Sequence, residues 1–252
     1  MKTINLEKAD IFQGPLILVN KDHQIKYKKH MQLVPINLKH KNIHLDTKAA
    51  AMLSKLLESI DCKNEIIPVS GYRSQDEQEK IYRDSLLENG AEFTHQYVAL
   101  PNRSEHQTGL AIDLGENSDP IDFIRPKFPY TGICGAFRAK ASEYGFIERY
   151  GRGKEATTGI SHEPWHFRYV GYPHSHVIEY NDLSLEEYIQ FIKAYPYERE
   201  HLTIQYKGKD IEVFYVESKS AITTIKMPDN DLYQVSGNNV DGFIVTVWGR
   251  YA

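Results

Sequence analysis

The sequence predicts an α+β domain, with a central antiparallel sheet and flanking helices, followed by a small all-β domain. Helical apolar spacing alternates with short strand-like runs up to about residue 195. Over residues 196–252, β-branched and aromatic runs replace that spacing. Hydrophobic residues at 41% and charged residues at 25% are ordinary values for a folded globular protein. We therefore expect one domain over residues 1–195, with residues 1–45 as an N-terminal arm, and a second over residues 196–252.

Capping signals and apolar spacing mark the elements of the first domain. Asp46 can cap a helix that runs to about Ile60. Ser74 and Glu77 form a capping box for a helix that stops at Gly90, and the same box recurs at the start of a helix over residues 184–194. A further helix is expected over residues 132–144, and strands are expected over residues 66–70, 110–114, 146–150 and 165–170.

The second domain is predicted from β-propensity and turn chemistry. The dipeptides Lys207-Gly208 and Asp241-Gly242 are typical of turns between strands. The strands themselves are expected over residues 202–206, 211–216, 221–225 and 243–248. About 55 residues lie near the lower size limit for independent folding, so this domain is expected to lean on the first.

Charge and apolar patterning exclude several classes of protein. A net charge of −4 gives no general attraction to nucleic acid or to an anionic membrane. The apolar run Pro15–Val19 is too short for a signal peptide or a membrane span, so we expect a cytoplasmic protein without an integral membrane segment. Cys62 and Cys134 lack the spacing of a thiolate metal site or a disulfide framework.

Two segments about fifty residues apart carry a set of metal-binding side chains. His106 and Asp113 lie in SEHQTGLAID, and His166 lies in HEPWH. Gly109 allows the chain to turn from a loop that holds His106 into a strand that carries Asp113, while His166 arrives on a neighbouring strand. Two imidazoles and one carboxylate suit a catalytic Zn²⁺, which needs three protein ligands and an open fourth position for water. The sequence therefore predicts zinc held by His106, Asp113 and His166.

Glu163 is the predicted general base of this site. It precedes His166 by three residues and is left uncoordinated, so it can take a proton from the attacking water and pass it to the leaving amine. HEPWH also matches the H-E-x-x-H pattern, in which His162 and His166 would be ligands on one helical face. We reject that alternative because Pro164 disfavours a helix and the following residues favour a strand.

The motifs resemble those of a known family. SEHQTGLAIDLG and GISHEPWHFRYVG resemble the two signatures of the zinc D-Ala-D-Ala metallopeptidases, S-x-H-x-x-G-x-A-x-D and E-x-W-H. SGYRSQDEQ resembles the family's segment for the substrate carboxylate. Longer stretches over roughly residues 15–195 are similar to the VanXY-type bifunctional D,D-dipeptidase/D,D-carboxypeptidases of vancomycin resistance. Residues 196–252 lie outside this resemblance.

The resemblance implies an activity and further site residues. It implies hydrolysis of D-Ala-D-Ala as the free dipeptide, or removal of the terminal D-Ala from a UDP-linked muramyl pentapeptide, which denies glycopeptide antibiotics their target. By position, Arg73 is expected to stabilise developing charge on the scissile carbonyl. Ser104 and Gln78 are expected to hold the substrate. The resemblance also implies a cytoplasmic enzyme, in agreement with the N-terminal sequence.

Two rival functions remain open on the sequence. The first is an L,D-carboxypeptidase acting on tetrapeptide stems, because its site residues look similar. The second is a non-catalytic module that binds wall precursors, with structural zinc and the β-rich tail as its interaction surface. A closed structural zinc site has four protein ligands, and no convincing fourth ligand accompanies His106, Asp113 and His166.

Overall fold

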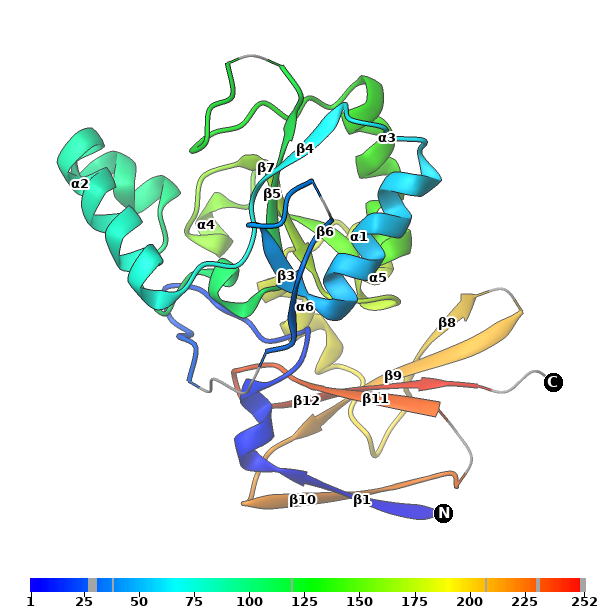
Figure 1. The fold of residues 1–252 in the computed structure, drawn as a ribbon. Coiled ribbons are helices and arrows are strands. Elements are labelled where there is room, and N and C mark those ends of the chain that lie inside the picture. Colours follow the sequence, from blue (N-terminus) through cyan, green and yellow to red (C-terminus); the bar gives the residue numbers. More distant parts are fainter. Residues whose placement is uncertain (27–30, 38, 119, 207, 230–231, 250–252) are drawn as a thin grey trace. The chain divides into compact units, whose positions relative to one another are not determined.

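The computed structural model describes residues 1–26, 31–37, 39–118, 120–206, 208–229 and 232–249. The chain forms two compact units, coloured by sequence in Figure 1. Val19–Gln24 and His30–Ser184 make up the first, which we call the mixed unit. Met1–Leu18, Ile25–Lys29 and Leu185–Ala252 make up the second, the β-rich unit. The N-terminal residues thus group with the C-terminal region.

A four-stranded antiparallel sheet is the centre of the mixed unit. Its strands are β4 (Ile66–Ser70), β5 (Ala111–Glu116), β7 (Glu163–Tyr169) and β6 (Phe146–Tyr150), in that spatial order. The short strands β2 (Leu33–Pro35) and β3 (His44–Asp46) pair separately. This sheet and its helices confirm the predicted α+β class.

The two faces of the sheet differ because side chains alternate along each strand. Ile112 of β5 lies opposite Phe167 of β7, and both belong to the hydrophobic core. Helices α1 (Thr47–Ser59) and α3 (Gly132–Ala141) supply the other side of that core (Figure 1). The next pair along the strands, Asp113 and His166, must therefore point to the opposite face.

The predicted helix signals match the observed helix ends. The Asp46 carboxylate accepts hydrogen bonds from the amides of Lys48 and Ala49 at the start of α1. The Ser74 capping box opens α2 (Gln75–Tyr97), and α3 runs on through η3 (Ser142–Tyr144) to a left-handed Gly145. Gly90 ends the first part of α2, as predicted, but a second helical part follows it to Tyr97 where a loop was expected.

Short helical segments complete the mixed unit. η2 (Glu105–Thr108) lies directly before β5, and α4 (Glu155–Thr158) lies between β6 and β7. α5 (His174–Tyr180) follows the cis peptide bond between Tyr172 and Pro173. Neither α4 nor α5 was predicted, because each is too short to show a helical period in the sequence.

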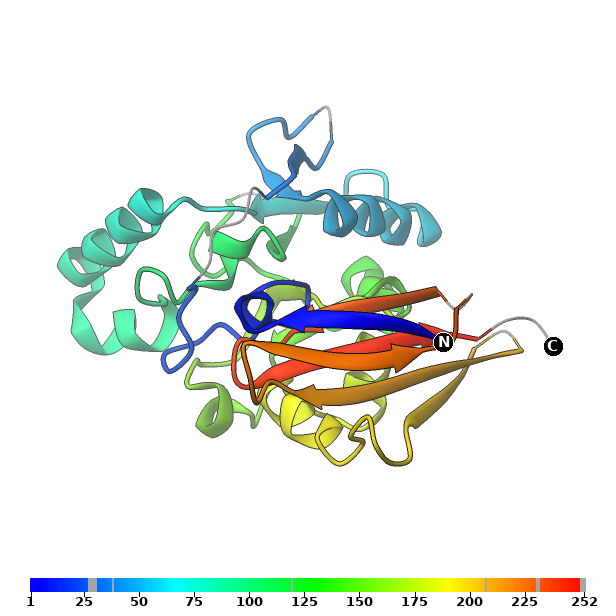
Figure 2. The same cartoon turned by 90° about the horizontal axis from the view of Figure 1, so that it is seen from below.

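The β-rich unit consists of two antiparallel sheets with a common core. One sheet has the order β11 (Leu232–Gly237), β12 (Gly242–Trp248), β9 (Lys209–Glu217) and β8 (Leu202–Tyr206). The other pairs β1 (Lys2–Glu7) with β10 (Ile222–Met227), side by side in Figure 2. Leu6 and Ile225 of the small sheet share a core with Phe243 of the large one.

The N-terminal region differs from its predicted role as an arm of the first domain. β1 pairs with β10 in register from Lys2 opposite Met227 to Glu7 opposite Ile222, so residues 1–18 complete the β-rich unit. The helices η1 (Lys8–Phe12) and α6 (Leu185–Ile192) also belong to this unit. The spacing of residues within a short segment does not show which distant segment it contacts, so the pairing of β1 with β10 could not be predicted from it.

Candidate metal centre and active site

Three buried side chains from distant segments meet on the polar face of the sheet. Asp113 of β5 and His166 of β7 are directly paired, and η2 brings His106 to the same point. His106 Nε2 lies 3.1 Å from Asp113 Oδ2, and His166 Nδ1 lies 2.9 Å from Asp113 Oδ1. One ligand atom from each residue lies within 4.8 Å of the others. The structure thus brings together the three predicted ligands.

The backbone around His106 fixes which ring nitrogen faces this group. His106 Nδ1 lies 2.7 Å from the Gly71 carbonyl oxygen, which can only accept a hydrogen bond. The proton is therefore on Nδ1, and the lone pair of Nε2 points toward Asp113. Gly109 ends η2 in the left-handed region, at φ 70°, and turns the chain into β5. A lone pair with a fixed direction is what a metal ligand requires, so the donor set fits a zinc ion.

Behind His166 lies a buried ion cluster that the sequence did not predict. Glu105 Oε1 accepts hydrogen bonds from Arg149 Nε at 2.8 Å and from Arg168 Nη1 at 2.7 Å. The side chains of all three residues are 0% exposed. Burial opposes ionisation of Glu105, but the charges of Arg168 and Arg149 outweigh it and hold its pKa well below the ordinary value.

Glu105 is also directed at the metal group. Its second oxygen, Oε2, lies 3.5 Å from His166 Nε2, and neither atom has a hydrogen-bond partner among the described residues. His166 Nδ1 faces Asp113, so Glu105 contacts the ring nitrogen on the far side. Carboxylates in this position commonly orient a histidine ligand. The sequence did contain a signal for this ion cluster. Glu105 directly precedes His106, and Arg149 and Arg168 lie inside strands, where a charged side chain needs a partner.

Glu163 lies at the start of β7, beside the metal group but outside it. Its side chain is 8% exposed, and Oε2 lies 3.9 Å from His166 Nδ1. Burial raises the pKa of Glu163 to about 8, with a further contribution from the charge of Asp113. A carboxyl group whose pKa lies near neutral pH can both take up and release a proton.

Arg73 follows β4 in the chain and is held in place by polar contacts. Its Nη2 donates to Asp113 Oδ2 at 3.0 Å, and its Nε donates to Ser70 Oγ at 2.8 Å. Its Nη1 lies 3.5 Å from Gln78 Oε1. The Arg73 side chain is 20% exposed and lines the cleft at the metal group. The structure therefore brings Arg73 to the predicted ligands.

The two predicted substrate-binding residues have different positions. Ser104 lines the cleft, and its hydroxyl makes no hydrogen bond to the described residues. Gln78 is 0% exposed and donates from Nε2 to the Ala99 carbonyl at 2.7 Å, behind Arg73. A direct contact between Gln78 and substrate stays a prediction, and it would require this side chain to leave its present partners.

The cleft around these residues has a volume of about 420 Å³. Trp165, Tyr150 and Ile160 form apolar parts of its wall beside the ionisable groups. Volumes in this range, with mixed apolar and convergent polar walls, are typical of small-ligand sites. The cleft is large enough for a short peptide.

His162 lies outside the metal group. Its Nε2 lies 2.8 Å from the Tyr130 hydroxyl and 3.2 Å from Glu148 Oε1. The segment Glu163–Tyr169 is a strand, so His162 and His166 cannot share one helical face. The rejection of the H-E-x-x-H alternative is confirmed.

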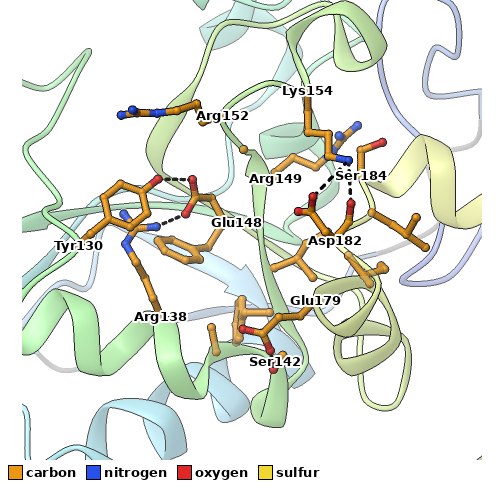
Figure 3. A pocket seen from close by; sticks show the side chains of 17 residues that line it. Tyr130, Arg138, Ser142, Glu148, Arg149, Arg152, Lys154, Glu179, Asp182 and Ser184 are labelled. Carbon is orange, nitrogen blue, oxygen red and sulfur yellow. Dashed lines mark hydrogen bonds and ion pairs between the residues drawn. The ribbon is translucent and has the colours of Figure 1, made fainter.

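A cavity of about 350 Å³ at the β6 edge of the sheet, drawn in Figure 3, contains none of the predicted site residues. Its charged side chains largely neutralise one another. Arg138 pairs with Glu148, and Lys154 Nζ lies 3.8 Å from the carboxylate oxygen Oδ2 of Asp182 (Figure 3). The chemistry therefore belongs to the cleft with the metal group.

Comparisons with known proteins agree with this geometry. Residues 42–172 match the family model "VanY: D-alanyl-D-alanine carboxypeptidase". The chain is 41% identical over 181 residues to the bifunctional D-Ala-D-Ala dipeptidase and D-Ala-D-Ala carboxypeptidase VanXYC of Enterococcus gallinarum, covering 70% of this chain and 94% of that protein.

Solved structures extend the similarity to the whole chain. The vancomycin-resistance D,D-dipeptidase VanXYg, in complex with a D-Ala-D-Ala phosphinate analogue, superposes with a TM-score of 0.96 at 55% identity, covering 98% of each chain. A mutant of the D,D-pentapeptidase VanY from a VanB-type cassette, in complex with Zn(II), superposes with a TM-score of 0.57 at 29% identity, covering 69% of this chain and 98% of that one.

Proposed function

Because the chain belongs to the VanY family of D-alanyl-D-alanine carboxypeptidases, we propose that it is a zinc peptidase that hydrolyses D-Ala-D-Ala. Its substrates are the free dipeptide and the D-Ala-D-Ala end of a pentapeptide precursor, and the result is resistance to glycopeptides such as vancomycin. The observation that carries this proposal is the convergence of His106, Asp113 and His166, from two distant segments, within 4.8 Å.

A zinc ion would be held by His106 through Nε2, by the Asp113 carboxylate and by His166 through Nδ1. When bound, zinc supplies a water of lowered pKa and polarises the substrate carbonyl. The orientation of both rings supports this ligand set, because His106 Nδ1 is engaged by Gly71 and His166 Nε2 faces Glu105. Three protein ligands leave one position open, as catalysis requires.

Glu163 moves the proton in this mechanism. Its carboxylate takes a proton from the attacking water and holds it on an oxygen close to His166, then transfers it to the nitrogen of the leaving D-Ala. The position of Oε2, 3.9 Å from His166 Nδ1, supports this role because the group is near the ligands without belonging to them. General acid–base catalysis of this kind contributes a factor of about 10² to 10⁴.

Arg73 and Ser104 orient the substrate. The guanidinium of Arg73 stabilises the negative charge that develops on the scissile carbonyl oxygen, and its contacts with Ser70 and Gln78 hold it for that purpose. The Ser104 hydroxyl offers the substrate a hydrogen bond from the cleft wall.

We place the reaction in the cytoplasm, as the resemblance to VanXY-type enzymes implies. Among the described residues, the helices include none with the length and apolar character needed to cross a membrane.

The test is D-Ala release by purified protein, after chelation and after return of zinc, from three substrates. These are free D-Ala-D-Ala, a UDP-linked pentapeptide, and a tetrapeptide stem whose last bond joins an L-centre to D-Ala. We expect zinc-dependent release from the first two and none from the third. Release from the tetrapeptide alone would assign an L,D-carboxypeptidase instead. Zinc-loaded protein that cleaves nothing would indicate a binding module.

A further inference from the structure

A second cavity, of about 400 Å³, adjoins the cleft that contains the metal group. Four residues, Val98, Ala99, Tyr150 and Ile160, line both spaces. Hydrogen bonds link this shared wall to Arg73. The Ala99 carbonyl accepts a hydrogen bond from Gln78, and Gln78 in turn contacts Arg73. The two spaces therefore lie next to each other along this shared wall.

The walls of the two spaces differ in charge. The cleft wall combines the carboxyl groups of Glu105, Asp113 and Glu163 with the guanidinium group of Arg73. The second cavity has no aspartate or glutamate in its wall, which instead contains Lys21 and Arg103. Since the whole chain has a net charge of −4, a cavity with only cationic charge is a local exception. Such a cavity attracts an anion.

The two cationic residues lie next to each other, and the Lys21 side chain is exposed. The Arg103 guanidinium donates to the Lys21 carbonyl, which ties the two residues together. The Lys21 side chain crosses Gly159, where a Cβ atom would lie 3.5 Å from its Cδ and Cε. Neither cation forms an ion pair with a carboxylate within the described part of the chain. Both charges are therefore available to a ligand.

We propose that this cavity binds an anionic group of substrates that are longer than the dipeptide. The inference rests on the proposed function. The cleaved bond is the last one of the substrate, so only the N-terminal side can reach beyond the cleft. The anionic group is a carboxylate on an upstream residue of the stem peptide or the diphosphate of a nucleotide carrier. Lys21 and Arg103 would thus favour anionic precursors over free D-Ala-D-Ala.

The test compares kcat/KM on four substrates. They are D-Ala-D-Ala, a pentapeptide with a free carboxylate upstream, the same pentapeptide with that carboxylate amidated, and the UDP-linked pentapeptide. The variants are K21E and R103Q. The control is K55E, which makes the same charge change at an exposed lysine of α1 that lines none of the cavities described above.

We expect K21E and R103Q to lower kcat/KM on an anionic pentapeptide, relative to D-Ala-D-Ala, by roughly 3- to 10-fold. The loss should shrink at high salt, because these charges are partly exposed, and K55E should leave the ratio unchanged. A loss on the carboxylate peptide identifies the stem as the anion, and a loss confined to the UDP-linked substrate identifies the diphosphate. An unchanged ratio in both variants, or an equal loss on the amidated peptide, would overturn the proposal.

A binding measurement separates this inference from the proposed function. Zinc-loaded E163Q protein, with and without K21E, is titrated with the UDP-linked pentapeptide and with the amidated pentapeptide without its carrier. We expect K21E to weaken the first interaction by a similar factor and to leave the second unchanged. This result supports the anion site even if the wild-type protein cleaves none of the substrates. Equal affinities with and without K21E contradict it.

Discussion

At the residue scale, the metal group depends on charges buried behind it. Glu105 accepts hydrogen bonds from Arg149 and Arg168 through one oxygen and faces His166 Nε2 with the other. Two buried guanidinium groups hold this carboxylate in place, with Oε2 3.5 Å from the ring nitrogen of His166 that faces away from Asp113. Zinc affinity and folding are therefore coupled through one side chain.

The E105Q variant tests this coupling. It leaves two guanidinium groups buried without a full anionic partner, which costs about 3–5 kcal/mol of folding stability. It also removes the carboxylate from His166, so we expect zinc affinity to fall about 10- to 100-fold. Denaturant unfolding and competitive zinc titration measure the two effects.

E148Q is the matched control for E105Q. Glu148 of β6 pairs with Arg138 of α3 and is not part of the metal group. We expect it to lower stability by a smaller amount, since its side chain is 21% exposed, and to leave the zinc dissociation constant unchanged. Equal zinc affinities for E105Q and wild type would contradict the role of Glu105.

The E163Q variant tests the proton transfer. The amide keeps the size of the side chain but cannot accept the proton of water, so kcat should fall about 10²- to 10⁴-fold. Glu163 lies outside the three-ligand group, so zinc content should stay at one ion per chain. Steady-state kinetics and metal analysis on the same preparation check both expectations. Retention of more than about a tenth of kcat would refute the role.

Some site residues could be predicted from the sequence and others could not. His106, Asp113, Glu163 and His166 lie in two compact motifs whose residue types already specify metal chemistry. Glu105 was missed because its partners lie 44 and 63 residues away in two other segments, and sequence spacing does not reveal such pairs.

At the element scale, the turn between η2 and β5 positions both His106 and Asp113. Gly109 has φ 70°, and its carbonyl accepts a hydrogen bond from the Asp46 amide. A Cβ atom there would lie 2.7 Å from Leu33 Cδ2 and 3.2 Å from the Asp46 nitrogen. Both the backbone conformation and the close approach thus require glycine.

The comparison of G109A with G159A separates these two requirements. Gly159 has the same left-handed backbone conformation, with φ 74° and ψ 8° against φ 70° and ψ 6°, but a Cβ atom there would make only ordinary contacts, at 3.5 Å or more. We expect G159A to cost about 1 kcal/mol from backbone strain alone, and G109A to cost roughly 1–3 kcal/mol more because it also overpacks its surroundings. Urea unfolding gives both values, and equal losses would contradict the argument.

Elements with local signals were predicted, and elements defined by distant pairing were not. The caps at Asp46 and Ser74 and the glycine at Gly145 determine helix ends through nearby atoms, so sequence alone located them. β1 has its partner β10 more than two hundred residues away, and the alternation of Ile4 and Leu6 in so short a run does not indicate which strand it pairs with.

At the scale of the whole molecule, acid sensitivity follows from a buried histidine. His174 is 3% exposed at the start of α5, and burial lowers its pKa to about 3. In the unfolded chain its pKa is about 6.5. Below pH 6.5 the unfolded state therefore takes up a proton that the folded state refuses, so stability falls as the pH drops from 6.5 toward 3.

The expected loss from His174 alone is about 2 kcal/mol between pH 7 and pH 5. Denaturant unfolding of metal-free protein at the two pH values measures it, and H174Q should remove most of this difference. The metal-free form is needed because zinc binding is itself pH-dependent. An equal pH dependence in H174Q and wild type would assign the acid sensitivity to other groups.

The division of the chain was predicted less well than its fold class. Periodicity and β-propensity predicted an α+β region followed by an all-β region, and the structure contains both. The boundary near residue 195 came from composition alone. The structure instead groups Met1–Leu18 with Leu185–Ala252, through strand pairing and a shared core that composition cannot reveal.

The most direct test of the central claim is a crystal structure of the zinc-loaded protein, with the metal located by anomalous scattering. We expect one zinc ion about 2.0–2.3 Å from His106 Nε2, an Asp113 oxygen and His166 Nδ1, with a water in the fourth position beside Glu163. A zinc ion elsewhere, or one enclosed by four protein ligands, would contradict the proposed peptidase.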